Sequence, residues 1–337
     1  GTNYLSVRGD EYKRLTPVYD WMKIPGATIV QLDKMPGENE IQKWGLTDYV
    51  GAVTDGTYGA VGLDFKSPHT GLAAKKVWFF FDKTYVCLGT DISSRMKNQV
   101  LTTVNQCPLN GEVTVSDADG IHPQERGSRM KKGVRWVVHD RVGYYFLNKE
   151  NVILSNQRTE GSWKIANRQT TTPTDIIQQD VFTLSVDHGS YPNNEGYAYM
   201  VVPSADPLSI EKQVEEEGVV VLANCPDVQA VRHDGLNMAY AVFYKGGTLR
   251  IHDKIVVEMD APGMLMVKYN DAGEILTLGV SDPTRFMKKL HLSVNQRIVG
   301  TAQENIQTEW DGKQALTRIS VDLPQNEYAG KSVIYNK

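Results

Sequence analysis

The chain is poor in the residues that build metal centres. It has only three cysteines in 337 residues, Cys87, Cys107 and Cys225, and they form neither a Cys-x-x-Cys pair nor a cluster with histidine. The seven histidines are also scattered, without the spacing of metal ligands. The pattern gives no support for a zinc site. We interpret two of the cysteines as small buried hydrophobic residues, because they lie in apolar, strand-like stretches.

Long hydrophobic runs and a strong charge of one sign are missing as well. No apolar stretch approaches the roughly 20 residues that a membrane-spanning helix needs. The net charge is −4 and the pI is about 6.0, so the chain lacks the basic footprint of a nucleic-acid-binding protein. An acidic polymer could be bound only through a local basic or hydrogen-bonding patch. One basic cluster could steer such a polymer, although an ordinary solvated loop explains it better: Arg126, Arg129, Lys131 and Lys132.

Signatures of known catalytic machinery are absent too. The chain has no Gly-x-Ser-x-Gly, no phosphate-binding loop, no His-Glu-x-x-His and no calcium-binding loop. Three histidines, His139, His188 and His291, lie within expected strands, where we interpret them as hydrogen-bonded sheet residues. The residues alone therefore nominate no catalytic group.

Short strands separated by turns dominate what is present. Residues 77–81 form an apolar run that fits a strand buried on both faces. Residues 134–146 predict two strands broken near His139-Asp140-Arg141, and in residues 181–188 apolar and polar side chains alternate. Beyond residue 219 the strands become shorter and more regular, which is typical of an antiparallel sandwich.

These patterns predict an all-β protein with a large antiparallel sheet domain followed by a smaller carboxyl-terminal β-sandwich. One helical stretch, residues 207–218, interrupts the strands; Ser209 can cap it and Gly218 can end it. We take this helix as a linker between domains at residues 1–206 and 219–337. The chain also begins inside a strand-like stretch with no signal peptide, so we expect it to be a piece of a longer protein.

Trp44 is the one aromatic residue for which the sequence suggests a role in binding. It follows a polar, loop-like stretch at residues 33–42 and precedes Gly45. The apolar face of a pyranose can stack on an indole, so Trp44 is a candidate sugar platform. Alternatively, the indole pins the loop to the sheet.

Several segments in order along the chain resemble polysaccharide lyase family 8, and chondroitin AC lyases most of all. The matching stretches run from near the amino terminus to residue 231: RGDEY and PVYDWMKIPGAT (8–28), KWG (43–45), VTDGTYGA (53–60), AAKKVWFFFDKTYVCLGTDI (73–92), TTVNQCPLNG (102–111), WVVHDRVGYYF (136–146), VDHGSYPNNEGYAYMVVP (186–203) and VLANCPDVQAV (221–231).

The resemblance implies a secreted or periplasmic bacterial enzyme with a helical toroid, a central super-sandwich and a carboxyl-terminal sandwich. Such enzymes cleave uronic-acid polymers, the glycosaminoglycans among them, by β-elimination. Their catalytic Asn, His, Tyr and Arg lie on the toroid, which this chain lacks. We therefore expect the acidic polysaccharide and the missing toroid as partners, and no catalytic residue in the chain.

Two residues carry over from the family's sites. Trp44 matches a tryptophan that contacts substrate from the β side of the cleft. Asp20 matches the first acidic position of a calcium site, but Met22, Gln31 and Leu32 replace its other ligands. A hard cation wants roughly six to eight oxygen ligands. We therefore expect this metal site to be lost and no cofactor to be bound.

Two other functions stay open. The chain could be a non-catalytic carbohydrate-binding module that uses Trp44. It could also be a mutarotase-like enzyme, which would need a histidine and a carboxylate on a concave sheet face, with His188 as the nominated histidine.

Overall fold

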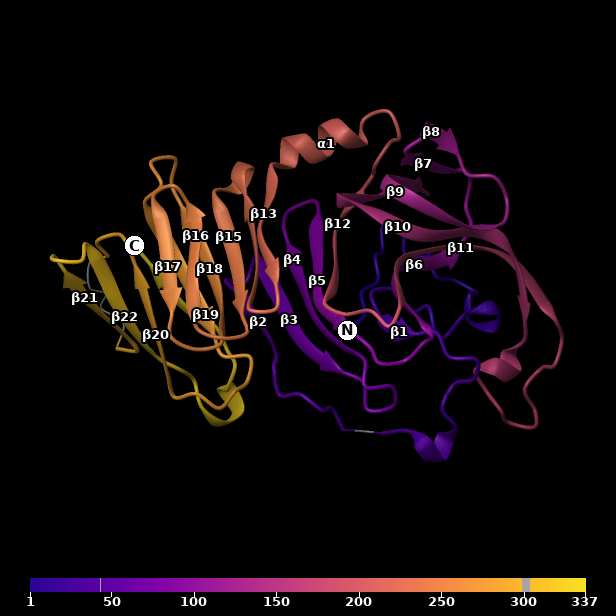
Figure 1. The fold of residues 1–337 in the computed structure, drawn as a ribbon, viewed down its shortest axis with the longest axis horizontal. Coiled ribbons are helices and arrows are strands. Elements are labelled where there is room, and N and C mark those ends of the chain that lie inside the picture. Colours follow the sequence, from indigo (N-terminus) through magenta and orange to yellow (C-terminus); the bar gives the residue numbers. More distant parts are fainter. Residues whose placement is uncertain (43, 299–303) are drawn as a thin grey trace. The chain divides into compact units, whose positions relative to one another are not determined.

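The computed structural model describes residues 1–42, 44–298 and 304–337, and most of its regular secondary structure is antiparallel strand (Figure 1). Contacts divide the chain into two compact units. The first unit comprises Gly1–Trp44, Lys66–Ala74 and Ile92–Ile210, and the second comprises Gly45–Phe65, Lys75–Asp91 and Glu211–Lys337. The all-β prediction is confirmed. The division at residues 206 and 218 stays a prediction.

The first unit contains a sheet in the order β1-β6-β11-β10-β12, with β9, β7 and β8 extending from β10. The bounds of these strands are β1 Thr28–Val30, β6 Gln99–Pro108, β7 Val113–Asp117, β8 Gly120–Pro123, β9 Ser128–His139, β10 Val142–Gly161, β11 Ile177–Ser190 and β12 Glu195–Pro203. The break predicted near residue 140 is confirmed: Asp140 and Arg141 adopt positive φ angles of 48° and 63° between β9 and β10.

The interior of the first unit is unusually polar along β6. Thr102, Thr103 and Asn105 are buried, and each has a hydrogen-bonding partner on a neighbouring element. Gln106 donates from Nε2 to the carbonyl oxygens of Asp20 and Lys23, at 3.0 and 2.7 Å. Because buried polar groups are costly unless they are hydrogen-bonded, these contacts fix how the amino-terminal segment lies on the sheet.

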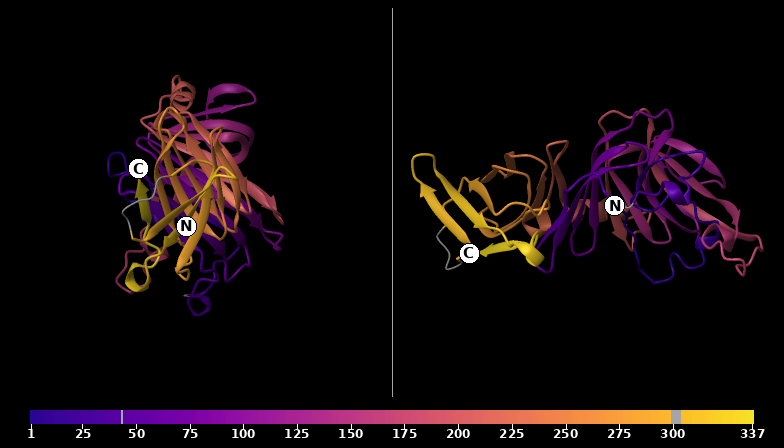
Figure 2. Two further views of the ribbon diagram at one scale, coloured as in Figure 1. Left: turned by 90° about the vertical axis from the view of Figure 1, so that its left-hand side faces the viewer. Right: turned by 90° about the horizontal axis from the view of Figure 1, so that it is seen from below.

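The second unit combines early strands of the chain with its carboxyl-terminal part. Strands β5, β4, β3 and β2 are neighbours in that order, while β13-β14-β15-β18-β19-β23 and β16-β17-β20-β22-β21 form two separate sheets. The bounds are β2 Val50–Thr54, β3 Gly59–Lys66, β4 Ala73–Phe80, β5 Tyr85–Ser93, β13 Val219–Cys225, β14 Val228–His233, β15 Met238–Phe243, β16 Gly247–His252, β17 Ile255–Met259, β18 Gly263–Tyr269, β19 Ile275–Ser281, β20 Lys289–Val294, β21 Ile306–Asp311, β22 Leu316–Asp322 and β23 Val333–Asn336. The last two sheets enclose one apolar core and form the predicted carboxyl-terminal sandwich (Figure 2).

Strand β2 is attached to this sandwich by specific contacts. The Tyr49 hydroxyl donates to the carbonyl oxygen of Phe243 at 2.9 Å, and the Ser281 hydroxyl donates to that of Ala52 at 2.7 Å. Gly51 lies directly on Pro283, where a Cβ atom would come within 2.8 Å of the proline Cα. Only glycine fits such a close approach of two backbones.

The predicted helix is present as α1 (Ile210–Glu217), and Ser209 directly precedes it; the turn at residues 207–209 has its own cap. The Asp206 side chain accepts the Leu208 N–H at 2.8 Å, and the Asp206 carbonyl accepts the Ile210 N–H at 2.9 Å. Gly218 ends the helix, as predicted, in the left-handed region at φ 61°. Within the described residues, no helix has the length and apolar character needed to cross a membrane.

Strand β4 carries a buried charge. Lys76 is 1% exposed, and its ammonium lies 5.2 Å from the centre of the Trp78 ring. Burial disfavours the charged form and lowers the pKa of Lys76 to about 7. The apolar run that β4 shares is otherwise buried as predicted, except that Phe80 is 41% exposed.

Replacing Lys76 with Met is expected to flatten the pH dependence of stability. Between about pH 7 and 10.5 the unfolded chain holds a proton that folded Lys76 has released, so the wild type loses stability as the pH falls through this range. Relative to Lys76→Met, the wild-type free energy of unfolding should rise by up to about 1.4 kcal/mol per pH unit. Urea titrations across this range measure the slope. Lys83→Met, at an exposed site, is the control; a Lys76→Met protein with the wild-type slope would contradict the expectation.

Candidate functional site

Trp44 lies at the end of a polar stretch, and its side chain is 83% exposed. The indole therefore does not pin the loop to the sheet. Burial of a large apolar side chain typically stabilises the folded state by about 1.5–3 kcal/mol. The exposed Trp44 side chain does not make this contribution. An exposed indole can accept the apolar face of a ligand. Lys43, which precedes it in the Lys-Trp-Gly motif, lies outside the described residues.

The segment around Asp20 does not fit calcium. One carboxylate oxygen of Asp20 accepts the Met22 N–H at 3.0 Å, and the other pairs with the Lys23 ammonium at 2.5 Å. The Gln31 side-chain amide donates to the carbonyl oxygens of Met22 and Ile29, at 3.1 and 3.2 Å. An ammonium and an amide N–H group thus use the oxygens that a cation would need. In residues 1–42, 44–298 and 304–337, no three His, Cys, Asp or Glu side chains are grouped to hold a metal.

The strand histidines of the first unit are hydrogen-bonded sheet residues, as expected. His188 Nε2 lies 2.8 Å from the Thr102 hydroxyl, which in turn lies 2.8 Å from the Thr28 hydroxyl. His139 accepts the Asn110 N–H at Nε2 and stacks on Phe182, with ring centres 4.3 Å apart. Burial lowers the pKa of His139 to about 4, so this imidazole is neutral near neutral pH.

The basic cluster noted in the sequence is neutralised. Arg126 pairs with Asp180 at 2.7 Å, Arg129 with Glu125 at 2.5 Å, and Lys131 with Asp117 at 3.0 Å. The hydrogen bond from Arg126 holds the pKa of Asp180 below its ordinary value. Only Lys132 of the four forms no ion pair in the described part of the chain. These cations therefore offer little charge to an acidic polymer.

A hollow of about 830 Å³ in the first unit was not predicted from the sequence. Segments at residues 66–73, 93–95 and 191–193 line it, and we call it the Lys66–Arg95 hollow. Its charged lining residues are both cations, Lys66 and Arg95, and Tyr191 lies on its wall with 59% of the side chain exposed. Sequence reasoning missed it because its three segments lie 20 and nearly 100 residues apart along the chain.

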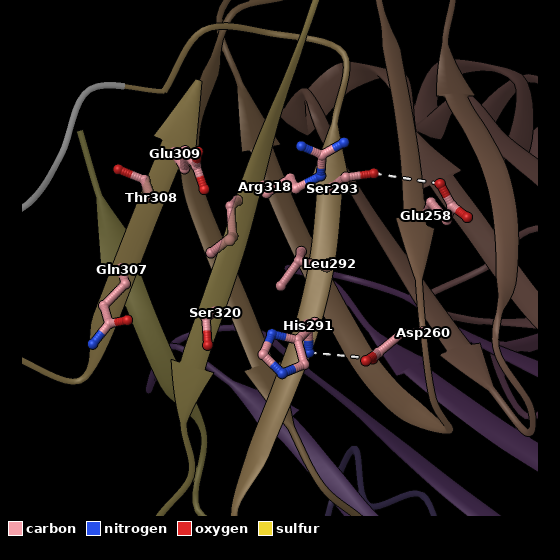
Figure 3. A pocket seen from close by; sticks show the side chains of 11 residues that line it. Glu258, Asp260, His291, Leu292, Ser293, Gln307, Thr308, Glu309, Arg318 and Ser320 are labelled. Carbon is pink, nitrogen blue, oxygen red and sulfur yellow. Dashed lines mark hydrogen bonds between the residues drawn. The ribbon is translucent and has the colours of Figure 1, made fainter. Parts of the chain in front are cut away.

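A second hollow, of about 590 Å³, lies on the outer face of the sheet containing β17, β20, β22 and β21 (Figure 3). Its lining includes three carboxylates, Glu258, Asp260 and Glu309, but one guanidinium, Arg318. The Arg318 side chain also pairs with Asp311 at 3.1 Å. This groove therefore carries excess negative charge and repels polyanions.

The groove brings a histidine and a carboxylate together, although not as an acid–base pair. Asp260 accepts the backbone N–H of His291 at 3.2 Å, and the backbone N–H of Asp260 donates to the His291 carbonyl at 3.1 Å (Figure 3). The carboxylate thus secures the strand backbone and does not orient the imidazole. The arrangement lacks the base–orienter contact expected of a catalytic pair.

Comparison with known families gives two matches in chain order. The model of the polysaccharide lyase family 8 super-sandwich domain matches residues 1–214. The model of the family's C-terminal β-sandwich domain matches residues 220–291. Both domains agree with the architecture described above.

Individual relatives point the same way. A chondroitinase-AC from Pedobacter heparinus is 35% identical over 99% of the chain and 45% of that protein. A hyaluronate lyase from Thermasporomyces composti is 29% identical over 93% of the chain and 40% of that protein. A solved chondroitinase AC lyase, studied with oligosaccharides, is 35% identical and superimposes with a TM-score of 0.83 over 98% of the chain and 46% of that structure. The chain thus spans less than half the length of these relatives.

Calcium and a chelator are expected to leave the stability of this protein unchanged. A ligand that binds only the folded state at 1,000 times its Kd would add about 4 kcal/mol to the free energy of unfolding. Since Lys23 and Gln31 occupy the oxygens around Asp20, millimolar calcium and excess EDTA should give the same thermal unfolding curve. A higher unfolding temperature in calcium, absent in an Asp20→Asn variant, would show that the site binds the ion after all.

Proposed function

Because the chain belongs to polysaccharide lyase family 8, we propose that it is the β-sheet region of a glycosaminoglycan lyase that cleaves a chondroitin- or hyaluronan-type polymer. The observation that carries this proposal is the 35% identity with a chondroitinase-AC over 99% of the chain. The likeness extends through both sheet domains of the family.

The proposed reaction is a β-elimination at a uronic-acid unit. A base removes the proton at C5, while hydrogen-bond donors neutralise the neighbouring carboxylate. The electron pair of the C5–H bond forms a C4=C5 double bond. The C4–O bond breaks, and its oxygen leaves with a proton from a general acid. The products are an unsaturated uronate and a new chain end.

We assign the catalytic groups to a helical toroid of the same polypeptide, outside this chain. Two facts support this assignment. The chain corresponds to less than half of its relatives, and its strongly perturbed buried groups, such as Lys76 and His139, lie within sheets, apart from the two hollows. The sheet region would then form a wall of the substrate site and support its geometry.

Trp44 is the residue of this region that we propose to contact the polymer. Its exposure supports the assignment, since the indole face is free to stack on a pyranose. The same property would let the chain act alone as a weak carbohydrate-binding module. We also propose a secreted or periplasmic location, because a polymer of this size is degraded outside the cytoplasmic membrane.

The isolated chain is expected to show no lyase activity. The purified protein would be mixed with chondroitin sulfate and, separately, with hyaluronan, and the ultraviolet absorbance of unsaturated uronate followed. A chondroitinase AC serves as the positive control and the heat-denatured chain as the blank. Activity that increases in proportion to the concentration of the intact chain would refute the assignment of catalysis to another domain.

Trp44→Ala is expected to weaken binding of chondroitin oligosaccharides about tenfold, which corresponds to about 1.4 kcal/mol. Isothermal titration of wild type and variant measures the change. The matched control is Trp310→Ala, which removes a partly exposed tryptophan from β21. Identical isotherms for wild type and Trp44→Ala would eliminate this residue as a sugar platform.

A further inference from the structure

The Lys66–Arg95 hollow combines two features that are not found together elsewhere among the sites described above. It is concave, and its charged lining residues are cations only. Neither Lys66 nor Arg95 forms an ion pair within the described residues, in contrast to Arg126, Arg129 and Lys131. In a chain of net charge −4, this is a local patch of positive charge that has kept its capacity to bind an anion.

The hollow has a defined shape because its segments are joined through the backbone. The Ser94 N–H donates to the Pro192 carbonyl at 2.9 Å, and the Tyr191 N–H donates to the Met96 carbonyl at 3.2 Å. The Asn194 N–H donates to the Ser93 hydroxyl at 3.0 Å. The loop that carries Arg95 and the loop that carries Tyr191 are therefore fixed to each other, and a ligand would meet preorganised partners.

Tyr191 occupies a backbone conformation that few aromatic residues adopt. Its φ angle is 51°, in the left-handed region, where a side chain with a Cβ atom is strained. Strain of this kind persists where surrounding contacts impose it, and it is concentrated at ligand-binding sites. The result is an aromatic ring that is held on the wall of the hollow yet remains 59% exposed.

We propose that the Lys66–Arg95 hollow binds an acidic sugar unit of a polysaccharide. The carboxylate or sulfate group lies between Lys66 and Arg95, and the apolar face of the pyranose packs on Tyr191. A guanidinium suits planar carboxylate and sulfate oxygens, while an ammonium adds a second charge-assisted contact. The volume, about 830 Å³, lies within the range of roughly 300–1,000 Å³ that is common for ligand sites.

The identity of the polymer that we assign to this site rests on the proposed function. Binding at the site does not depend on catalysis. The acidic groove of Figure 3 shows the contrast. That groove carries more carboxylates than cations and disfavours an anion, whereas the Lys66–Arg95 hollow selects for negative charge. The chain would thereby hold the polymer at a position additional to Trp44.

The test is a titration of the whole chain with defined hexasaccharides. The probes are a chondroitin sulfate hexasaccharide, a hyaluronan hexasaccharide, the neutral maltohexaose and inorganic sulfate. Wild type should bind the two acidic hexasaccharides, with an affinity that falls as salt is raised, and should bind maltohexaose negligibly. The combined variant Lys66→Ala/Arg95→Ala should bind the acidic hexasaccharides at least about tenfold more weakly, since two charge-assisted contacts are lost.

Two further variants separate this site from general charge effects. Tyr191→Ala should weaken hexasaccharide binding without changing its salt dependence, because it removes a stacking surface and no charge. Lys149→Ala removes one exposed cation of the same unit and should leave binding at the wild-type level. Thermal unfolding of each variant establishes that it is folded.

Three outcomes would overturn the proposal. The first is equal loss of affinity in Lys149→Ala and in the combined variant. The second is unchanged affinity in the combined variant. The third is binding of inorganic sulfate as tight as that of the hexasaccharides, which would make the hollow a simple anion site. The lyase proposal is tested separately, by cleavage of the polymer. The binding site can therefore be refuted without refuting the lyase function, and the reverse also holds.

Discussion

The apolar face that β4 presents through Val77 and Phe79 governs the architecture of the second unit. Both side chains are fully buried, and the ring of Phe79 lies 5.9 Å from that of Tyr240 in β15. Phe81 contacts Tyr240 and His233, with ring centres 5.7 and 4.7 Å apart. An early strand thus finds its apolar cover in a sheet formed more than 150 residues later. This is why contacts group residues 45–65 and 75–91 with the carboxyl-terminal sandwich.

Local pattern was sufficient to predict the class of the fold and much of its strand series. Alternation and apolar runs are properties of neighbouring residues, and the turn at Asp140 and Arg141 follows from a short polar break. The helix was predicted to start at residue 207, but residues 207–209 form a turn in which Asp206 accepts the Leu208 N–H, and α1 starts at Ile210. The assignment of strands to units could not be predicted, since it depends on which sheets come to cover which faces.

The candidate sites were less predictable, because charge pairing is a tertiary property. Arg126 resembles a free cation in sequence, yet its partner Asp180 is 54 residues away. Lys66 and Arg95 stand alone in sequence, and folding brings them to one hollow without a carboxylate. Trp44 could be nominated because a tryptophan in a polar loop is conspicuous locally, and its exposure agrees with that reading. The distribution of paired and unpaired cations reconciles an acidic chain with the acidic ligand that we propose.

The attachment of β2 to the sandwich limits how this family region can be rearranged. Tyr49, Gly51 and Ala52 contact Phe243, Pro283 and Ser281 through hydrogen bonds and direct backbone apposition. A gene segment encoding only residues 219–337 would leave these surfaces, and the apolar face of β4, without their counterparts. The carboxyl-terminal sandwich therefore depends on the early strands for part of its cover, and we expect a recombination boundary near residue 219 to leave both partners with exposed surfaces.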